Sequence, residues 1–202
     1  MNFPAARGAI FDLDGTLMDS GLDFEQMRRE MELPPRRPIL EAIADLPPDR
    51  AAVCWRILER HEREGAEQAT ILPGVPEFLG RLSARGLKRG VLTRNSRSAT
   101  LASLARLGTE FDTIVAREDA PPKPDPQGIW KICDAWGLAP SEVAMIGDYR
   151  FDLEAARGAG ARAVLFVEGQ QPADYADFPP ADYVLPSFLA GEEFLAWLAE
   201  PI

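Results

Sequence analysis

The 202-residue sequence predicts an α/β protein, a doubly wound parallel sheet that carries a small helical insert. Short apolar runs of strand length recur along the chain, and most are apolar throughout, as is typical of strands covered on both faces. Segments with helical periodicity lie between these runs. One long stretch, residues 20–71, interrupts the alternation and contains no convincing strand pattern.

The expected core elements alternate in chain order. The strands lie at residues 8–13, 89–93, 112–116, 142–147, 161–167 and, more weakly, 182–185. The helical segments lie at 75–86, 98–108, 126–137 and 151–160, and each ends in glycine, a common helix stop. This alternation predicts a parallel sheet with helices on both faces. A proline- and aspartate-rich loop at 169–183 leads to the last strand and a terminal helix.

The insert at residues 20–71 contains three amphipathic helical segments, at 22–33, 38–46 and 48–69. Proline-rich turns separate them. Ordinary connections between a strand and the next helix of a sheet are far shorter than this. We therefore predict two domains, a core of residues 1–19 and 72–202 and a helical cap of residues 20–71.

The composition is that of an ordinary soluble globular chain, with 46% hydrophobic and 27% charged residues. The net charge of −10 disfavours non-specific binding to nucleic acid or anionic membranes, because such binding requires basic patches. No apolar run reaches the length of about 18 residues that a membrane span requires. We expect no nucleic-acid partner, no membrane association, and a monomer or weak dimer.

The two cysteines, Cys54 and Cys133, are far apart and form no CxxC pair. We interpret them as reduced, packed thiols. We expect no secretory leader, because the first residues lack a proper apolar stretch with a cleavage site. A cytoplasmic location is therefore expected, and one disulfide in an exported protein is the alternative.

Polar side chains gather where four predicted strands end, and ligands of open α/β sheets bind outside those carboxyl ends. The residues concerned, in chain order, are Asp12 and Asp14, then Thr93, Arg94 and Asn95, then Lys123, and finally Asp148 and Asp152. Taken singly, each has a structural explanation: an Asp-Gly turn, a strand threonine, a solvated lysine, or an acid in the first turn of a helix. Their convergence at one edge of the sheet favours a shared site.

This combination suits phosphoryl transfer assisted by a metal ion. Clustered carboxylates are ligands for a hard cation such as Mg²⁺, which would offset the repulsion between the acids. An aspartate can act as a nucleophile and form an acyl phosphate, while a second acid protonates the leaving oxygen. Asp12 and Asp14 point opposite ways on an extended strand, so a turn at Gly15 is needed to bring both to a substrate.

The motifs "DLDGT", "LTRNS", the lysine of "PPKPDP" and "IGDYRFDLEAARGAG" resemble the four motifs of the haloacid dehalogenase-like hydrolase superfamily, in order and with its spacing. The phosphoglycolate-phosphatase-like branch, with a small helical cap after the first strand, is the most similar. The resemblance implies that Asp12 is the nucleophile and Asp14 the general acid and base. It assigns Thr93 and Lys123 to the phosphoryl group.

The same resemblance implies a Mg²⁺ site formed by the carboxylates of Asp12 and Asp148 and the backbone carbonyl of Asp14. Asp152 would support the metal from outside the ligand sphere or through Lys123. The acid at position 14 disfavours a true dehalogenase, because those enzymes lack it. The fourth motif departs from the usual pattern at Tyr149 and Arg150, where smaller or polar residues are more common.

We expect a Mg²⁺-dependent phosphatase of small phosphate monoesters, phosphoglycolate-like or sugar phosphates. Four arginine and asparagine residues are candidates for substrate binding, namely Arg94 and Asn95 beside the second strand and Arg36 and Arg37 in a cap loop. One alternative is a phosphosugar mutase with the same motifs. The other is a non-enzymatic Mg²⁺-binding interaction module.

Overall fold

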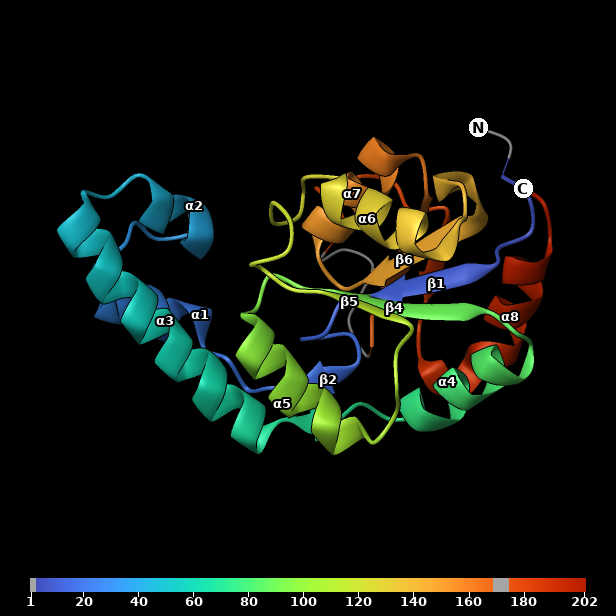
Figure 1. Cartoon of the computed structure of the whole chain (residues 1–202), viewed down its shortest axis with the longest axis horizontal. Coiled ribbons are helices and arrows are strands. Elements are labelled where there is room, and N and C mark those ends of the chain that lie inside the picture. The colour runs from blue at the N-terminus through green and yellow to red at the C-terminus, as the bar shows by residue number, and fades with distance from the viewer. Residues whose placement is uncertain (1–2, 169–174) are drawn as a thin grey trace.

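The core of the protein is a six-stranded sheet, seen in a computed structural model that describes residues 3–168 and 175–202. Its spatial order is β5-β4-β1-β6-β7-β8, and every neighbouring pair is parallel (Figure 1). The strands are β1 (Gly8–Phe11), β4 (Lys88–Leu92), β5 (Thr113–Val115), β6 (Val143–Gly147), β7 (Arg162–Phe166) and β8 (Tyr183–Leu185). The parallel sheet confirms the predicted fold class, and each predicted strand is present.

Five helices cover the two faces of this sheet, as predicted. They are α4 (Val75–Ala84), α5 (Arg97–Leu107), α6 (Gln127–Trp136), α7 (Arg150–Ala159) and α8 (Gly191–Ala199). One face packs against α4, α5 and α8, with Phe11 and Phe78 at the centre of its apolar cluster. The other packs against α6 and α7 around Ile10 and Leu153. Side chains of β1 point into both clusters, so this strand is buried on both faces.

The three predicted insert helices are α1 (Phe24–Glu30), α2 (Ile39–Ala44) and α3 (Pro48–Gln68). They enclose an apolar cluster of their own, built around Met27, Ile43 and Leu58. In Figure 1 the far end of this group lies apart from the sheet, while the last turns of α3 lie beside α5. The separate cluster supports the proposed division into core and cap.

Two short strands that the sequence did not predict flank the cap. β2 (Met18–Asp19) pairs antiparallel with β3 (Thr70–Ile71), at the points where the chain leaves and re-enters the core. The backbone N–H of Leu72 also donates to the carbonyl oxygen of Leu17, 3.1 Å away. Two-residue strands are too short to show a periodicity in sequence, so the pattern could not reveal this pair.

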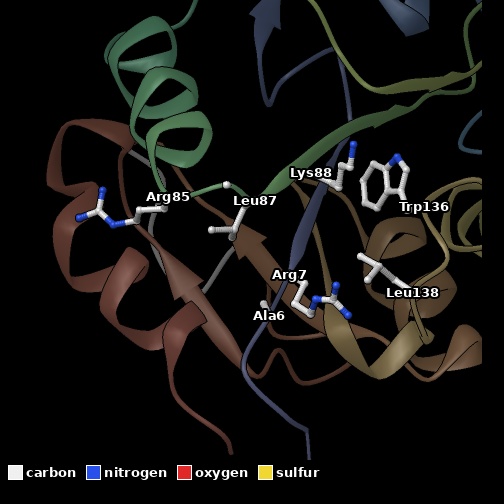
Figure 2. A pocket seen from close by; sticks show the side chains of 8 residues that line it. Ala6, Arg7, Arg85, Leu87, Lys88, Trp136 and Leu138 are labelled. Carbon is white, nitrogen blue, oxygen red and sulfur yellow. The ribbon is translucent and has the colours of Figure 1, made fainter.

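A pocket of about 310 Å³ lies at the amino ends of β1 and β4, at the opposite edge from the predicted site. Figure 2 shows Arg7, Lys88 and Trp136 around it. The Trp136 indole donates to Thr113 Oγ1 at 2.9 Å. Arg7 is paired with Glu142 at 3.0 Å and Lys88 with Asp112 at 2.8 Å. The charges at this edge are thus neutralised within the protein.

Several chain-wide expectations can be compared with the structure. Cys54 and Cys133 are both free and buried, which confirms the packed thiols. Within residues 3–168 and 175–202, no helix combines the length and the apolar character that crossing a membrane requires. The predicted loop at 169–183 includes residues 169–174, which lie outside the described residues.

Candidate active site

A tight turn follows β1 and positions the two aspartates of the first motif. The backbone N–H groups of Leu17 and Met18 both donate to the Leu13 carbonyl, at 2.9 and 3.0 Å. Gly15 adopts a φ of +75°, and a Cβ at this position would lie 2.3 Å from Asp148 Oδ2. Only glycine fits, because both the positive φ and the close approach exclude a side chain. The turn predicted at Gly15 is therefore present.

A buried ion-pair triad lies beside this turn. Lys123 Nζ is 2.7 Å from Asp12 Oδ1 and 2.6 Å from Asp152 Oδ1. The side chains of Lys123 and Asp152 are each only 1% exposed. Burial alone would lower the pKa of Lys123, but the two carboxylates outweigh that effect and raise it. Lys123 is therefore a fixed positive charge that links the loop after β5 to the ends of β1 and α7.

Three carboxylates meet at the carboxyl ends of β1 and β6. Oxygen atoms of Asp12, Asp148 and Asp152 all lie within 4.8 Å of one another. Burial and the neighbouring charges of Asp12 and Asp152 raise the pKa of Asp148 to about 8. Burial also raises the pKa of Asp152 to about 6, against the lowering effect of Lys123. The cluster holds more negative charge than its one lysine neutralises.

This donor set fits a hard divalent cation. Closely spaced carboxylate oxygens are the ligands that Mg²⁺ takes, and a bound cation would relieve the repulsion that raises the Asp148 pKa. Thr16 donates its hydroxyl to Asp148 Oδ1 at 3.2 Å and orients that carboxylate. Asp152 is held by Lys123 and by the backbone N–H of Tyr149, which donates to its Oδ2 at 3.1 Å.

Asp14 lies on the cap side of the turn, half-buried and outside the three-carboxylate cluster. Burial is the main cause that raises its pKa to about 6, and the charge of Asp12 adds to it. The side-chain amide of Asn95 donates a hydrogen bond to Asp14 Oδ2. A carboxyl group with this pKa can both give and take a proton near neutral pH.

Thr93, which the sequence placed at the end of the second strand, directly follows β4 in the structure and is 4% exposed. Its hydroxyl oxygen accepts a hydrogen bond from the backbone N–H of Asn95 at 3.1 Å. Thr93, Asn95 and the three clustered carboxylates line one pocket of about 650 Å³ between core and cap. The structure thus brings the residues of all four motifs together.

Arg94 forms a bridge between core and cap. Its guanidinium donates to both oxygens of Glu41 on α2, at 2.9 and 2.6 Å, and also to the carbonyl oxygen of Lys123. The guanidinium carbon lies 4.8 Å from the centre of the Phe151 ring. Arg94 lines the pocket, but its donors are directed at protein groups. Its predicted role in substrate binding stays a prediction.

The two cap arginines differ in position. Arg36 lines the pocket, whereas Arg37 is paired with Asp45 inside the cap and does not line it. The backbone of Arg36 has a φ of 61°, in the left-handed region that few residues other than glycine adopt. The predicted substrate contact is therefore geometrically accessible to Arg36 and not to Arg37 in this conformation.

Sequence reasoning missed two residues of the site. Thr16 belongs to the quoted first motif, and its place directly after Gly15 was the available signal. Glu62 of α3 is 3% exposed, lines the pocket, and accepts hydrogen bonds from Ser96 N at 3.2 Å and from the Arg117 guanidinium. It falls on the same helical stripe as the buried Leu58, so its spacing could have identified it.

Comparison with known proteins gives one family. A model described as haloacid dehalogenase-like hydrolase matches residues 21–166. A haloacid dehalogenase-like hydrolase domain-containing protein of Arabidopsis thaliana is 33% identical over an alignment of 174 positions, which covers 80% of this chain and 71% of that protein. A phosphoglycolate phosphatase of Chromobacterium violaceum is 31% identical over 191 residues, covering 81% of this chain and 86% of the other.

A solved structure shows the same fold. The crystal structure of a hydrolase from Pseudomonas syringae superimposes with a TM-score of 0.80 at 23% identity, covering 96% of this chain and 100% of that chain. The agreement extends over almost the whole chain, including the residues of the cap. The arrangement of the sheet and its helical insert is therefore one that a solved protein also adopts.

Proposed function

Because this chain belongs to the haloacid dehalogenase-like hydrolase family, as an enzyme of its phosphoglycolate-phosphatase-like branch, we propose that it is a cytoplasmic, Mg²⁺-dependent hydrolase of small phosphate monoesters. The observation that carries this proposal is the contact of Lys123 with Asp12 and Asp152, beside Asp148, where four strand ends meet. The alternative enzyme with the same motifs, a phosphosugar mutase, has no specific observation in its favour.

In the proposed reaction, Asp12 attacks the phosphorus of the substrate and becomes an aspartyl phosphate. Asp14 gives its proton to the leaving alkoxide and later takes a proton from the water that cleaves the acyl phosphate. The raised pKa of Asp14, about 6, supports both roles. Asn95 keeps that carboxyl oriented toward the reacting atoms through its amide hydrogen bond.

The remaining residues neutralise and position the phosphoryl group. Lys123 supplies a fixed positive charge, and Thr93 supplies a hydroxyl at the floor of the pocket. Asp12 and Asp148, with the backbone carbonyl of Asp14, would hold Mg²⁺. When bound, this ion supplies positive charge to the phosphoryl oxygens. Asp152 acts through Lys123, which it holds in place.

The test is phosphate release from an aryl phosphate with and without Mg²⁺. We expect activity only with the metal, and Asp12→Asn lowers kcat by at least about a thousandfold, because the nucleophile is lost. Asp134→Asn, on the exposed side of α6, is the matched control and keeps full activity. Full activity of Asp12→Asn would contradict the nucleophile assignment, and transfer between hexose positions without phosphate release would favour the mutase.

A further inference from the structure

The pocket between core and cap is lined by many residues besides the proposed catalytic ones. Its volume of about 650 Å³ falls within the range of about 300–1,000 Å³ that drug-sized ligands occupy. A phosphate monoester of two carbons occupies only a small part of that space. The rest of the lining therefore faces the leaving group, and the lining decides which leaving groups fit.

Carboxylates outnumber cations in this lining by eight to four. Four of the carboxylates lie outside the catalytic group, namely Asp19, Asp23, Glu25 and Glu62. Glu62 is paired with Arg117, which lies outside the lining, but even with this pair and a bound divalent ion the lining would keep excess negative charge. A leaving group that carries its own carboxylate or phosphate would meet repulsion here.

Three of the four cations of the lining are held in ion pairs, so they are not free to attract an anionic leaving group. Lys123 is held by Asp12 and Asp152, Arg94 by Glu41, and Arg28 by Glu25 at 2.8 Å. Among the described residues, Arg36 is the one cation of the pocket with no ion pair. It is exposed on the cap loop, where its charge is screened by solvent.

The apolar part of the lining comes from both sides of the pocket. On the core side, Tyr149 is 47% exposed, and its ring makes edge contacts with Phe151 and Phe178, at 5.0 and 5.6 Å between ring centres. On the cap side, Phe24 is 50% exposed, and Leu40 is half-buried. When an apolar ligand covers exposed rings that line a pocket, binding becomes more favourable, because apolar surface is removed from water.

We infer that Tyr149 and Phe24 form a subsite for an uncharged, apolar leaving group, so that the preferred substrates are monoesters of alcohols bearing an aromatic ring or alkyl chain. The inference rests on the phosphatase activity proposed above and narrows its substrate class. It also gives a role to Tyr149, the bulky residue by which the fourth motif departs from the usual pattern. Phosphoglycolate, whose leaving group is anionic, is then a poor substrate.

The experiment compares four phosphate monoesters that differ only in what is attached to the carbon atom bearing the phosphate. They are methyl phosphate, 2-phenylethyl phosphate, glycerol 1-phosphate and phosphoglycolate. We expect kcat/KM for 2-phenylethyl phosphate to exceed that for methyl phosphate by about ten- to fiftyfold, because one ring is removed from water. Phosphoglycolate falls below methyl phosphate.

Variants identify the subsite. Tyr149→Ala and Phe24→Ala each lower the ratio of phenylethyl to methyl turnover by about tenfold, whereas Tyr149→Phe keeps it, because the ring remains. Leu189→Ala removes a side chain that is 71% exposed and does not line the pocket, and it leaves the ratio unchanged.

Two negative results are distinguishable. If no ester is hydrolysed, including methyl phosphate, the proposed function fails and this inference fails with it. If methyl phosphate is hydrolysed but phosphoglycolate or glycerol 1-phosphate equals or exceeds 2-phenylethyl phosphate, the phosphatase stands and the apolar subsite is wrong. An unchanged ratio in both alanine variants likewise overturns the subsite.

Discussion

Two lysines at opposite ends of the same sheet make ion pairs of nearly equal length in very different surroundings. Lys123, beyond the carboxyl ends of the strands, lies 2.7 and 2.6 Å from Asp12 and Asp152 and is 1% exposed. Lys88, at the start of β4, lies 2.8 Å from Asp112, and its side chain is 50% exposed. Distance alone therefore does not show what each pair contributes.

The difference lies in the cost of removing charge from water. Surface pairs such as Lys88–Asp112 contribute about 0–1 kcal/mol, because water already solvates both partners. Charges that are buried must be neutralised by their neighbours, but at the site three acids share one lysine. Burial and this shortage of positive charge raise the pKa values of Asp148 and Asp152 well above the ordinary value. Unneutralised charge at one end of the sheet lies at the proposed active site, and paired charge at the other end lies on ordinary surface.

The largest effect is expected from exchanging each lysine for methionine. Lys123→Met leaves the buried carboxylate of Asp152 and the partly buried one of Asp12 without their cation, and lowers the free energy of unfolding by about 3–5 kcal/mol. It also lowers phosphatase kcat by at least about a hundredfold, because the proposed donor to the phosphoryl group is lost. Urea unfolding followed by circular dichroism measures the first effect, and phosphate release measures the second.

Lys88→Met is the matched control, with the same side-chain change at an exposed pair. It changes the unfolding free energy by at most about 1 kcal/mol and leaves kcat unchanged. Equal losses in the two variants would show that burial does not separate the pairs. The double variant Lys123→Met with Asp152→Asn should recover part of the lost stability, because it removes one orphaned charge.

A second effect concerns pH and Mg²⁺. Asp14, Asp148 and Asp152 have folded-state pKa values of about 6, 8 and 6, above the ordinary value of 3.8. The folded chain therefore binds more protons than the unfolded chain between about pH 4 and pH 8, and the metal-free protein loses stability as the pH rises through that window. Mg²⁺ at 100 times its Kd would restore about 2.7 kcal/mol at pH 8.

Thermal unfolding with and without Mg²⁺ at pH 5 and pH 8 measures how much the metal stabilises the protein at each pH. The increase in Tm on adding Mg²⁺ should be larger at pH 8, because protons compete with the metal for the carboxylates at pH 5. Asp148→Asn removes most of that pH-dependent difference. An increase in Tm that is equal at both pH values would contradict metal binding at the three-carboxylate cluster.

The sequence allowed prediction of the sheet, the helices and the convergence of the motifs for one reason. Parallel strands buried on both faces are continuously apolar, and their carboxyl ends share one edge, so Asp12, Thr93 and Asp148 had to lie close together. The glycines at positions 15, 108, 137 and 160 indicated turns in the sequence, and each has a positive φ in the structure. Local periodicity and this topological rule were sufficient for these elements.

What could not be predicted depends on contacts between distant segments. Nothing local indicated that Arg94 would bind Glu41, 53 positions earlier, or that the Asn95 amide would reach Asp14. The two-residue strands β2 and β3 pair only because the cap closes a long loop between them. Arg37 also pairs inside the cap and not over the site, because Asp45 is within its reach.

A smaller effect is expected at the Arg94–Glu41 bridge, which is intermediate between the two lysine environments. Its side chains are 20% and 39% exposed, so Glu41→Gln should lower the unfolding free energy by only about 0.2–1 kcal/mol. The bridge joins α2 to the core, and weakening it favours separation of cap and core. Hydrogen exchange of the α2 amides should accelerate, and KM should change more than kcat.

Glu59→Gln makes the same change on the exposed side of α3 and is the control for this bridge. It should leave both hydrogen exchange and KM as they are in the unmodified protein. If Glu41→Gln and Glu59→Gln behave alike, the bridge does not hold the cap in place.

The smallest effect is expected at the amino-end pocket of Figure 2. Arg7 is 64% exposed and is paired with Glu142 at 3.0 Å, so Arg7→Ala should change the unfolding free energy by less than about 0.5 kcal/mol. Its kcat/KM should stay within about twofold of the original value, because the whole sheet separates Arg7 from the reacting groups. A tenfold loss in kcat/KM without a loss of stability would mean that this edge is coupled to the site through β1, and paired surface charge would then no longer mark a region without function.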